Sequence, residues 1–481
     1  MRDHVCRTLN KQRAFRHVWQ TGLRRAAARV LLREPTLIPA DPVPCDNVTT
    51  STREAHRSEE IRASILAVTS EIPWPLDSGG HLRTYHVLRL LAAHFRVRLI
   101  FPSRSDDAVD GCTALERAGI EARAVAVGRR NPVGEAIRLS RAAIANEPYV
   151  MFARHHYQAV RRRLQEELTK SRPDVLYLDH LDSFAYAREA SDLPVVGDMH
   201  NVYSRLALRL AQGERRWIPR AYLSHEANLI ARMERSAARL AHTMLAVSDN
   251  EAQYFSTLGA TRVTTVVNGV DCGAYAMLPV GQRTGPPTIL YVGSFNWPPN
   301  AAAARFLAAE VLPVVARALP EARVLLVGKD PGPELRRLAQ ASDRIEIAAH
   351  VTDVMPYLRR AHLLAVPLET GGGTRLKILE AFAAGLPVVS TPVGCEGISA
   401  VNGEHLVVSE RAGFAAATLQ SLLGRGVATR LAESARCLAR ERYDWAVVGA
   451  SAVGAVAAAA ASGSDAARGN GATIQRRLRA S

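Results

Sequence analysis

Apolar runs alternate with amphipathic stretches along the chain from residue 64 onward. The runs that suit strands are residues 64–69, 97–101, 175–177, 195–197 and 244–247. Stretches with helical periodicity lie between them, at residues 81–93, 157–169 and about 222–240. This alternation predicts a mostly parallel sheet with helices on both faces.

A segment of linker composition, "GQRTGPP" at residues 281–287, divides this pattern into two sets. The second set has strand candidates at "TILYVG", "ARVLLVG", "IEI", "LLAVP" and "PVVS". Helices are expected between these strands, at residues 301–318, 334–340, 354–360 and 374–384. Two sets of similar size predict an α/β protein with two Rossmann-like domains, residues 62–275 and 276–445, on either side of a cleft. Ligands of such sheets bind beyond the carboxyl ends of the strands.

The two ends of the chain depart from this pattern. Residues 1–61 are rich in Arg, Thr, Pro and Ser and read as a basic flexible extension, and residues 446–481 read as an Ala/Gly-rich basic tail. Residues 1–60 hold 11 Lys/Arg against 7 Asp/Glu (+4) and residues 461–481 hold 4 against 1 (+3), so +8 of the net +15 lies between them. A mildly basic body without interleaved aromatic residues is a weak case for nucleic acid, and no nucleic-acid partner is expected.

Six cysteines are scattered along the chain without a C-x-x-C pair. This usage indicates reduced thiols in a cytoplasmic protein without a secretory leader. The apolar stretch "AVVGASAVGAVAAAAA" is mostly Ala and Gly, and we interpret it as a helix end that fades into the tail, not as a membrane span. The basic body and tails leave peripheral contact with the inner face of the cell membrane as an option.

The stretch "ETGGGTRLKILEAFAAGLPVVS" carries the first chemical signal. Glycines 371–373 lack β-carbons, so a ligand can approach bare backbone N–H groups there. A helix is expected to begin at Thr374, and its N-terminus offers unpaired donors and partial positive charge. Because Arg375 and Lys377 add full charges beside that end, the stretch favours an anion.

Similar glycine turns recur after other predicted strands. Gly79 and Gly80 follow the first strand and precede a helix, and Gly293 stands in "YVGSFNWPPN" after the first strand of the second set. The segment "LVGKDPGP" contains another glycine turn after a predicted strand. One such turn is explained by core packing, but their recurrence at the same ends of both sheets points to a ligand.

Seven segments in series resemble glycosyltransferase family 4, the retaining, nucleotide-sugar-dependent enzymes of GT-B fold. They are "PWPLDSGGHLRTYHVLRLLA", "DVLYLDHLDSFAY", "GDMHNVYSR", "VVNGVD", "LYVGSFNWPPNAAAARFL", "LLVGKDP" and "VPLETGGGTRLKILEAFAAGLPVVSTPVGCEG". The resemblance covers about residues 62–450 and includes the subgroup associated with exopolysaccharide sugar transfer. It implies an acceptor domain followed by a nucleotide-sugar domain, with a final helix around "RERYDWAVVGA" that crosses back to the first.

The resemblance assigns roles to individual residues. Glu380 matches the carboxylate that binds the ribose hydroxyls, and His200 matches the histidine that lies against the donor sugar, so these two are the catalytic candidates. Asp179 and His180 are expected on the acceptor side, and Asp198 either orients His200 or caps a turn. The nucleotide sugar, expected to be a UDP- or GDP-sugar, would be bound by Gly79, Gly80, Gly293, Gly371, Gly372, Gly373, Thr374, Arg375, Lys377 and Glu380.

The chain departs from the family pattern at two places. Gly372 stands where the family has the first carboxylate of its Glu-x7-Glu motif, and Glu369 lies three residues too early. The Arg and Lys that usually bind the diphosphate after the first strand of this domain are replaced by "SFNWPPN". We expect Arg375 and Lys377 to supply the missing charge from the helix end.

The resemblance predicts transfer of the sugar to a hydroxyl on a sugar or a lipid-linked saccharide, in polysaccharide or glycoconjugate biosynthesis. Two alternatives stay open: a nucleotide-sugar epimerase of the same fold, and a non-catalytic member that binds the nucleotide sugar without transfer. The sequence shows neither paired carboxylates at glycosidase spacing nor clustered metal ligands, so neither a metal nor a cofactor is expected.

Overall fold

The computed structural model describes residues 63–76, 78–104, 108–128, 131–190, 192–275, 278–351, 353–370 and 375–478. The predicted extension at residues 1–61 lies outside the described residues. So do Gly371, Gly372, Gly373 and Thr374.

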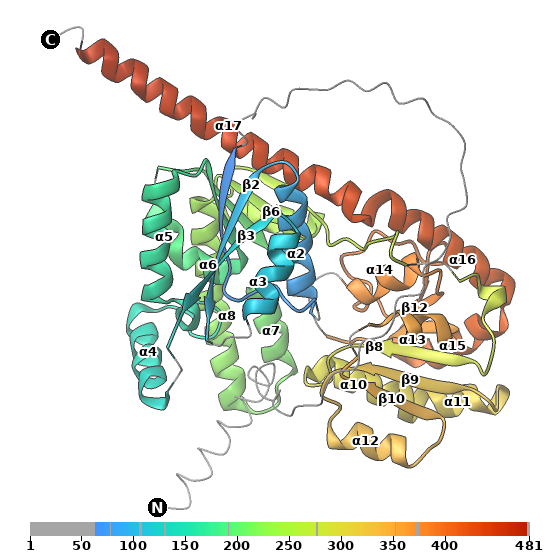
Figure 1. The fold of residues 1–481 in the computed structure, drawn as a ribbon. Helices are drawn as coiled ribbons and strands as arrows, with labels where there is room; N and C mark the ends of the chain where they lie inside the picture. Colours follow the sequence, from blue (N-terminus) through green and yellow to red (C-terminus); the bar gives the residue numbers. More distant parts are fainter. Residues whose placement is uncertain are drawn as a thin grey trace, which may run out of the picture. The chain divides into compact units, whose positions relative to one another are not determined.

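Among the described residues, seven parallel strands form the first sheet, in the order β3-β2-β1-β4-β5-β6-β7 (Figure 1). The strands are β1 Ser64–Val68, β2 Arg96–Ser103, β3 Ile120–Ala126, β4 Val175–Asp179, β5 Val195–Met199, β6 Thr243–Ala246 and β7 Val263–Thr265. Strand β1 is the third strand in this order, and its Ile65 pairs with Val97 of β2 and Val175 of β4. We call this sheet and its helices the first lobe.

Helices cover both faces of this sheet, as the alternation predicts. They are α2 Gly79–Ala92, α3 Ala108–Arg117, α4 Pro132–Ala145, α5 Gln158–Ser171, α6 His180–Ser183, α7 Tyr203–Gly213, α8 Trp217–Leu240 and α9 Asp249–Thr257. Because side chains alternate along a strand, Leu66 and Val68 join the core on one face and Ile65 and Ala67 the core on the other. Both cores are needed to bury so apolar a strand.

A second sheet of six parallel strands, again within the described residues, has the order β10-β9-β8-β11-β12-β13. Its strands are β8 Thr288–Val292, β9 Arg323–Gly328, β10 Ile345–Ala349, β11 Leu363–Val366, β12 Val388–Ser390 and β13 Val407–Val408. Its helices are α10 Pro298–Phe306, α11 Leu312–Ala318, α12 Pro333–Gln340, α13 Met355–Arg360, α14 Leu376–Ala383, α15 Phe414–Leu423 and α16 Arg425–Leu438. We call this sheet and its helices the second lobe.

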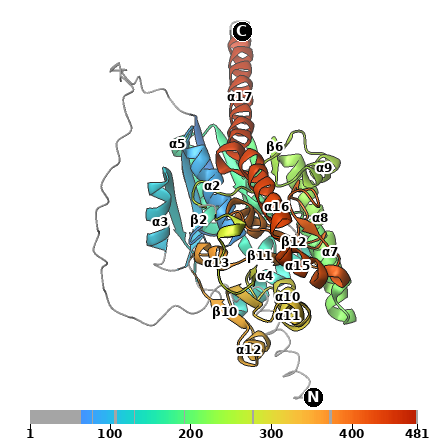
Figure 2. The same ribbon diagram turned by 90° about the vertical axis from the view of Figure 1, so that its right-hand side faces the viewer.

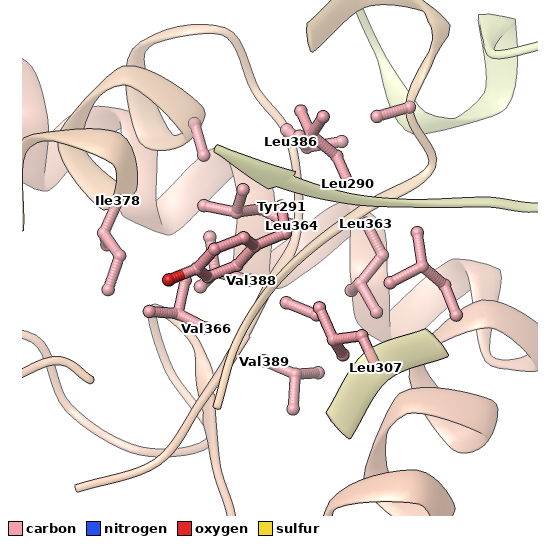
Figure 3. Close-up of a cluster of buried hydrophobic side chains, with 14 of the residues drawn as sticks. Leu290, Tyr291, Leu307, Leu363, Leu364, Val366, Ile378, Leu386, Val388 and Val389 are labelled. Atoms are coloured by element: carbon pink, nitrogen blue, oxygen red, sulfur yellow. The ribbon is translucent and has the colours of Figure 1, made fainter. Parts of the chain in front are cut away.

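The core of the second lobe surrounds β8 and β11. Figure 3 shows the Tyr291 ring among Leu364, Val366 and Val388. The Tyr291 hydroxyl donates a hydrogen bond to Asn300 Oδ1 at 2.7 Å, so this buried phenol is satisfied.

The chain crosses between the lobes twice, and the two crossings pair with each other. Val270, on the way to β8, accepts a hydrogen bond from the Trp445 N–H and donates its own N–H to the Tyr443 carbonyl, at 3.2 and 2.7 Å. Trp445 then begins helix α17, Trp445–Leu478, whose buried residues pack on the first lobe beside α2 (Figure 2).

The expectation of a tail from residue 446 needs correction, because residues 446–478 are helical. Alanine has the highest helix propensity, so the run of alanines around residues 455–461 favours helix where the apolar pattern weakens. Within the described residues, one segment, Trp445–Gly463, is long and apolar enough to cross a membrane by length and composition alone. Its buried face includes Val448, Ala452 and Val456, which contact the first-lobe core.

Candidate functional site

The glycine turn at the start of α2 lies where the two lobes meet. Ser78 caps the helix by accepting a hydrogen bond from the His81 N–H at 3.2 Å. A β-carbon at position 80 would lie 3.6 Å from His180 Nε2 in the first lobe, and one at position 79 would lie 3.4 Å from Leu376 Cδ1 in the second. The turn therefore stands directly between the predicted acceptor-side histidine and the predicted diphosphate helix.

Two histidines share one buried carboxylate at the carboxyl ends of β4 and β5. Asp179 Oδ2 lies 2.8 Å from His180 Nδ1, and Asp179 Oδ1 lies 2.9 Å from His200 Nε2. Thr84, from α2, donates a further hydrogen bond to Asp179 at 2.9 Å. The centroids of the two imidazole rings are 3.5 Å apart. Since Asp179 is 0% exposed, it positions both histidines and has no surface of its own toward a ligand.

His180 also adopts a strained backbone conformation, with φ at +66°. Non-glycine residues rarely occupy this region, and such strain concentrates at functional sites. The hydrogen bond between its Nδ1 and Asp179, together with the burial of the other residues of α6, keeps the residue there.

The three groups have different protonation states. Although burial by itself would raise it, the two imidazoles hold the pKa of Asp179 well below its usual range. Burial opposes the charge on His180, but the Asp179 carboxylate outweighs it and raises the pKa of His180 to about 9. Burial and the neighbouring His180 charge lower the pKa of His200, against the pull of Asp179. At neutral pH the cluster is therefore an Asp179–His180 ion pair beside a neutral His200.

Asp198 binds a different partner from the one the sequence suggested. Arg83, 1% exposed, donates to Asp198 through Nη2 at 2.6 Å and Nε at 3.1 Å, and Tyr177 donates to the same carboxylate at 2.7 Å. His200 Nε2 is 3.8 Å from Asp198 and only 2.9 Å from Asp179. The expectation that Asp198 orients His200 or caps a turn is corrected: Asp179 orients the imidazole, and Asp198 neutralises Arg83.

The buried Arg83 was missed by sequence reasoning. Its Nη1 also donates to the Val266 carbonyl at 2.7 Å and to Asn268 Oδ1 at 3.0 Å. It thus joins α2, β5 and the first crossing between the lobes. An arginine three residues after a Gly-Gly turn is an ordinary surface residue in most helices, so the sequence held no signal for it.

Lys377 reaches from α14 to the carboxyl end of β8. Its Nζ lies 4.4 Å from the centroid of the Tyr291 ring, and a β-carbon at position 293 would lie 3.1 Å from the same atom. Burial, and then the nearby Arg375 charge, lower the pKa of Lys377 to about 7, against the pull of Glu380. The Lys377 side chain therefore stands beside the Gly293 turn.

Glu380 and Arg375 lie on either side of Lys377 along the chain. Tyr275 donates a hydrogen bond to Glu380 Oε1 at 3.1 Å, and burial raises the pKa of this carboxyl. Arg375 precedes the first residue of α14, and its Nη2 lies 3.5 Å from the Val393 carbonyl. The helix was expected to begin at Thr374 and begins two residues later, at Leu376.

Glu369, three residues before position 372, takes part in an ion-pair network. Its carboxylate pairs with Arg411 at 2.6 Å, and Arg411 also pairs with Glu310 at 3.0 Å. The Glu369 side chain, 57% exposed, is thus held in a surface network.

A cavity of about 60 Å³ lies beside His200, between α7, α9 and the loop after β12. Arg209 of α7 crosses it to pair with Glu396 of the second lobe at 2.7 and 2.8 Å. Two lining atoms, Asn201 Oδ1 and Glu251 Oε2, are buried and have no hydrogen-bond partner among the described residues. Burial raises the pKa of Glu251 to about 7. None of these residues was singled out from the sequence, because they come from three separate segments.

Asp179, His180 and His200 also form a group that could hold a metal ion, with one donor atom from each within 4.8 Å of the others. The sequence showed no clustered metal ligands, and the fold makes this group by joining the ends of β4 and β5. In the structure these donor atoms already hydrogen-bond one another, which gives each a partner without a metal.

Comparison with known families matches almost the whole of both lobes. A model described as Glycosyltransferase Family 4 matches residues 78–273, and one described as Glycosyl transferases group 1 matches residues 286–423.

Solved structures show the same architecture. The Anabaena protein HepE in complex with UDP-glucose has a TM-score of 0.59 and 14% identity, over 82% of this chain and 99% of that one. Sucrose-phosphate synthase from Thermosynechococcus elongatus has a TM-score of 0.59 and 15% identity, over 87% of this chain and 100% of that one. At these identities the likeness concerns the fold.

Curated relatives match over shorter stretches. Glycogen synthase of Mycobacterium tuberculosis is 28% identical over 202 residues, which are 40% of this chain and 47% of the relative. D-inositol 3-phosphate glycosyltransferase of Rhodococcus erythropolis is 30% identical over 285 residues, 54% of this chain and 61% of the relative. The chain therefore spans about half the length of the curated relatives it matches.

Proposed function

Because this chain belongs to the family 4-like glycosyltransferases of GT-B fold, we propose that it transfers a sugar from a nucleotide-diphosphate donor to a hydroxyl acceptor. We propose further that the anomeric configuration is retained and that the product is a polysaccharide or glycoconjugate. The observation that carries the proposal is the position of the Gly79 turn between the His180–His200 pair and the start of α14. It brings the catalytic and nucleotide-binding candidates of the two lobes to one place.

The donor would lie against the second lobe. Lys377 and Arg375 would neutralise the diphosphate from the start of α14, in place of the Arg and Lys that the family takes from the loop after its first strand. The reach of Lys377 to the Gly293 turn supports this replacement. The Glu380 carboxylate would accept hydrogen bonds from the ribose hydroxyls. A UDP-sugar fits the neighbour HepE, which was solved with UDP-glucose.

His200 would lie against the donor sugar. As a neutral imidazole that donates Nε2–H to Asp179, it keeps Nδ1 as an acceptor for a sugar hydroxyl. The positive charge of His180 is balanced by Asp179, so the pair adds little net charge where an oxocarbenium ion would develop. In the proposed step the acceptor oxygen bonds to the anomeric carbon as the bond to the phosphate oxygen breaks. That phosphate oxygen, on the same face, takes the acceptor proton.

The acceptor would bind against the first lobe, with a hydroxyl directed into the cavity of about 60 Å³ beside His200. Asn201 Oδ1 and Glu251 Oε2 are unpartnered acceptor atoms, and the hydroxyls of a sugar or a lipid-linked saccharide are suitable donors for them. We propose a cytoplasmic protein that reaches lipid-linked acceptors by peripheral contact with an anionic membrane.

The test is a thermal-shift screen over nucleotide sugars, followed by donor turnover with a panel of acceptors. A donor that binds the native state raises the Tm by mass action. Glu380→Gln is expected to reduce that shift. His200→Ala is expected to keep it and to lower turnover by about 10²-fold.

Other outcomes would support one of the two alternative functions. An epimer formed from donor alone would indicate the epimerase. A donor that raises the Tm but is never consumed, with any acceptor, would indicate a non-catalytic member.

A further inference from the structure

Helix α4 turns its large apolar side chains outward. Val133 is 70% exposed, Ile137 50%, Leu139 48% and Ile144 87%. Of the helix residues whose burial is described, only Ala142 is buried. Amphipathic helices normally bury their apolar side, which supplies most of their stability in a folded protein. An apolar face this exposed is typical of an interaction site.

The beginning of α8 also exposes large apolar side chains. Trp217 is 77% exposed, Ile218 61% and Tyr222 37%. These residues form the tip of the α7–α8 hairpin, since α7 ends at Gly213 and α8 begins at Trp217.

The two elements are linked by the loop that follows α4. Tyr149 in this loop donates its hydroxyl to Glu135 of α4 at 2.6 Å. The backbone N–H groups of Tyr149 and Val150 hydrogen-bond to Glu226 of α8, which also hydrogen-bonds Tyr222. Figure 1 shows α4 beside the lower part of α8. We call the exposed residues of α4 and of the α8 start the outer patch.

Exposed arginines are interleaved with these apolar side chains. They are Arg141 on α4 and Arg215, Arg216 and Arg220 around the hairpin tip. Three of the acidic groups nearby hydrogen-bond within the protein, whereas Glu147 lies partly exposed in the loop after α4: Glu214 pairs with Arg216 at 2.9 Å, Glu135 accepts from Tyr149, and Glu226 accepts the two backbone N–H groups. Aliphatic side chains, a tryptophan and arginines together suit the boundary between lipid headgroups and acyl chains.

From these observations we propose that the outer patch binds the surface of an anionic lipid bilayer. The arginines complement anionic headgroups, whereas a second copy of the chain would bring the same arginines against one another. This inference specifies the membrane contact of the proposed function, and the binding itself does not require transfer activity.

The position of the patch agrees with a role in acceptor delivery. Helix α4 follows the carboxyl end of β3, and the α7–α8 hairpin follows the carboxyl end of β5, directly after His200. The patch therefore lies toward the edge of the first sheet that holds the cluster of Asp179, His180 and His200. A chain docked this way would receive a lipid-linked acceptor at that edge.

The experiment is co-sedimentation of the full chain with vesicles of phosphatidylcholine alone and with added phosphatidylglycerol. The wild type is expected to bind the anionic vesicles and to lose binding at high salt. The double variant Trp217→Ser/Ile144→Ser is expected to bind about tenfold more weakly. Val427→Ser, a 50% exposed apolar residue on α16, is the matched control and should bind as wild type does.

The melting temperatures of the variants and donor turnover with a soluble acceptor, measured without vesicles, separate this inference from the proposed function. Both should be unchanged in the double variant, because its substitutions lie on the surface. Equal vesicle binding by wild type and double variant would overturn the inference. So would a concentration-dependent dimer that the double variant abolishes, since the patch would then be an interface between copies.

Discussion

The fold lowers the pKa of the Lys377 side chain, and a bound diphosphate would raise it again. The side chain lies beside Tyr291 and the Gly293 turn, and burial together with Arg375 lowers its pKa to about 7. In the free protein it is therefore about half protonated at pH 7. A diphosphate within a few ångströms would favour the charged form.

Donor binding is accordingly expected to take up protons. The sign follows from the lowered pKa: at pH 8 most Lys377 side chains are neutral in the free protein and charged in the complex, so affinity falls as pH rises above 7. Titration calorimetry in buffers of different ionisation enthalpy measures the uptake, expected at about half a proton or more between pH 7 and 8. Lys377→Met should abolish it. The same uptake in that variant would show that another group titrates.

The sequence singled out His200, His180 and Asp179, but it did not predict that both histidines hydrogen-bond to Asp179. Asp179 and Asp198 both stand at strand ends, and only the burial of Arg83 against Asp198 leaves Asp179 for the histidines. That choice depends on side chains from α2, which periodicity cannot place. The roles assigned to these residues in donor and acceptor binding stay predictions.

Among the elements, the turns after β8 and β9 pack against each other more closely than any side chain would allow. A β-carbon at position 328 would lie 1.8 Å from the Gly293 carbonyl oxygen, and Gly328 has φ at +153°. The approach brings the loop with Lys329 beside the loop with Ser294, and the Phe295 N–H donates to the Lys329 carbonyl at 2.8 Å.

Gly328→Ala is expected to lower the free energy of unfolding by about 3 kcal/mol, because backbone and not a flexible side chain must move. Gly332→Ala is the matched control, since nothing lies within 4 Å of a β-carbon there, and its loss should be about 1 kcal/mol or less. Urea denaturation of both variants measures the difference. Equal midpoints would contradict the close packing of the two turns.

Most of the strands that the sequence predicted have continuous apolar runs and are buried on both faces; the edge strand β10, predicted from "IEI", is the exception. Strand β3, "IEARAVA", was missed because it lies at a sheet edge and alternates buried with partly exposed residues. Strand β7 is an edge strand of three partly buried residues, too short for a period. Tertiary pairing, which no local pattern contains, makes both of them strands.

For the whole molecule, the two-domain α/β architecture was predicted correctly from the alternation and the linker at residues 281–287, and the GT-B fold was predicted correctly from the family resemblance. Contacts between the lobes were not predictable, since they join residues far apart in sequence. Arg209 and Glu396 are the clearest case, with two hydrogen bonds between half-exposed side chains at the cavity beside His200.

Charge reversal at Arg209 is expected to favour separation of the lobes. Exposed ion pairs contribute about 0.5–1 kcal/mol, so Arg209→Glu should weaken donor binding by about two- to fivefold and change the Tm little. Fluorescence transfer between labels on the two lobes would measure the separation. The exchanged pair, Arg209→Glu with Glu396→Arg, should restore both readings. A double variant that behaves like the single one would show that the pair does not hold the lobes together.

The return of α17 to the first lobe bears on how the protein is made. Trp445 stacks on His86 with ring centroids 4.8 Å apart, and Gly269 leaves room for its indole, while Val448, Ala452 and Val456 complete one face of the core around β1. That face stays uncovered during synthesis until residues 445–459 have emerged from the ribosome, by which time the second lobe has emerged in full. The order of domain completion is therefore reversed relative to the order of translation, and the nascent first lobe exposes an apolar surface suited to a chaperone.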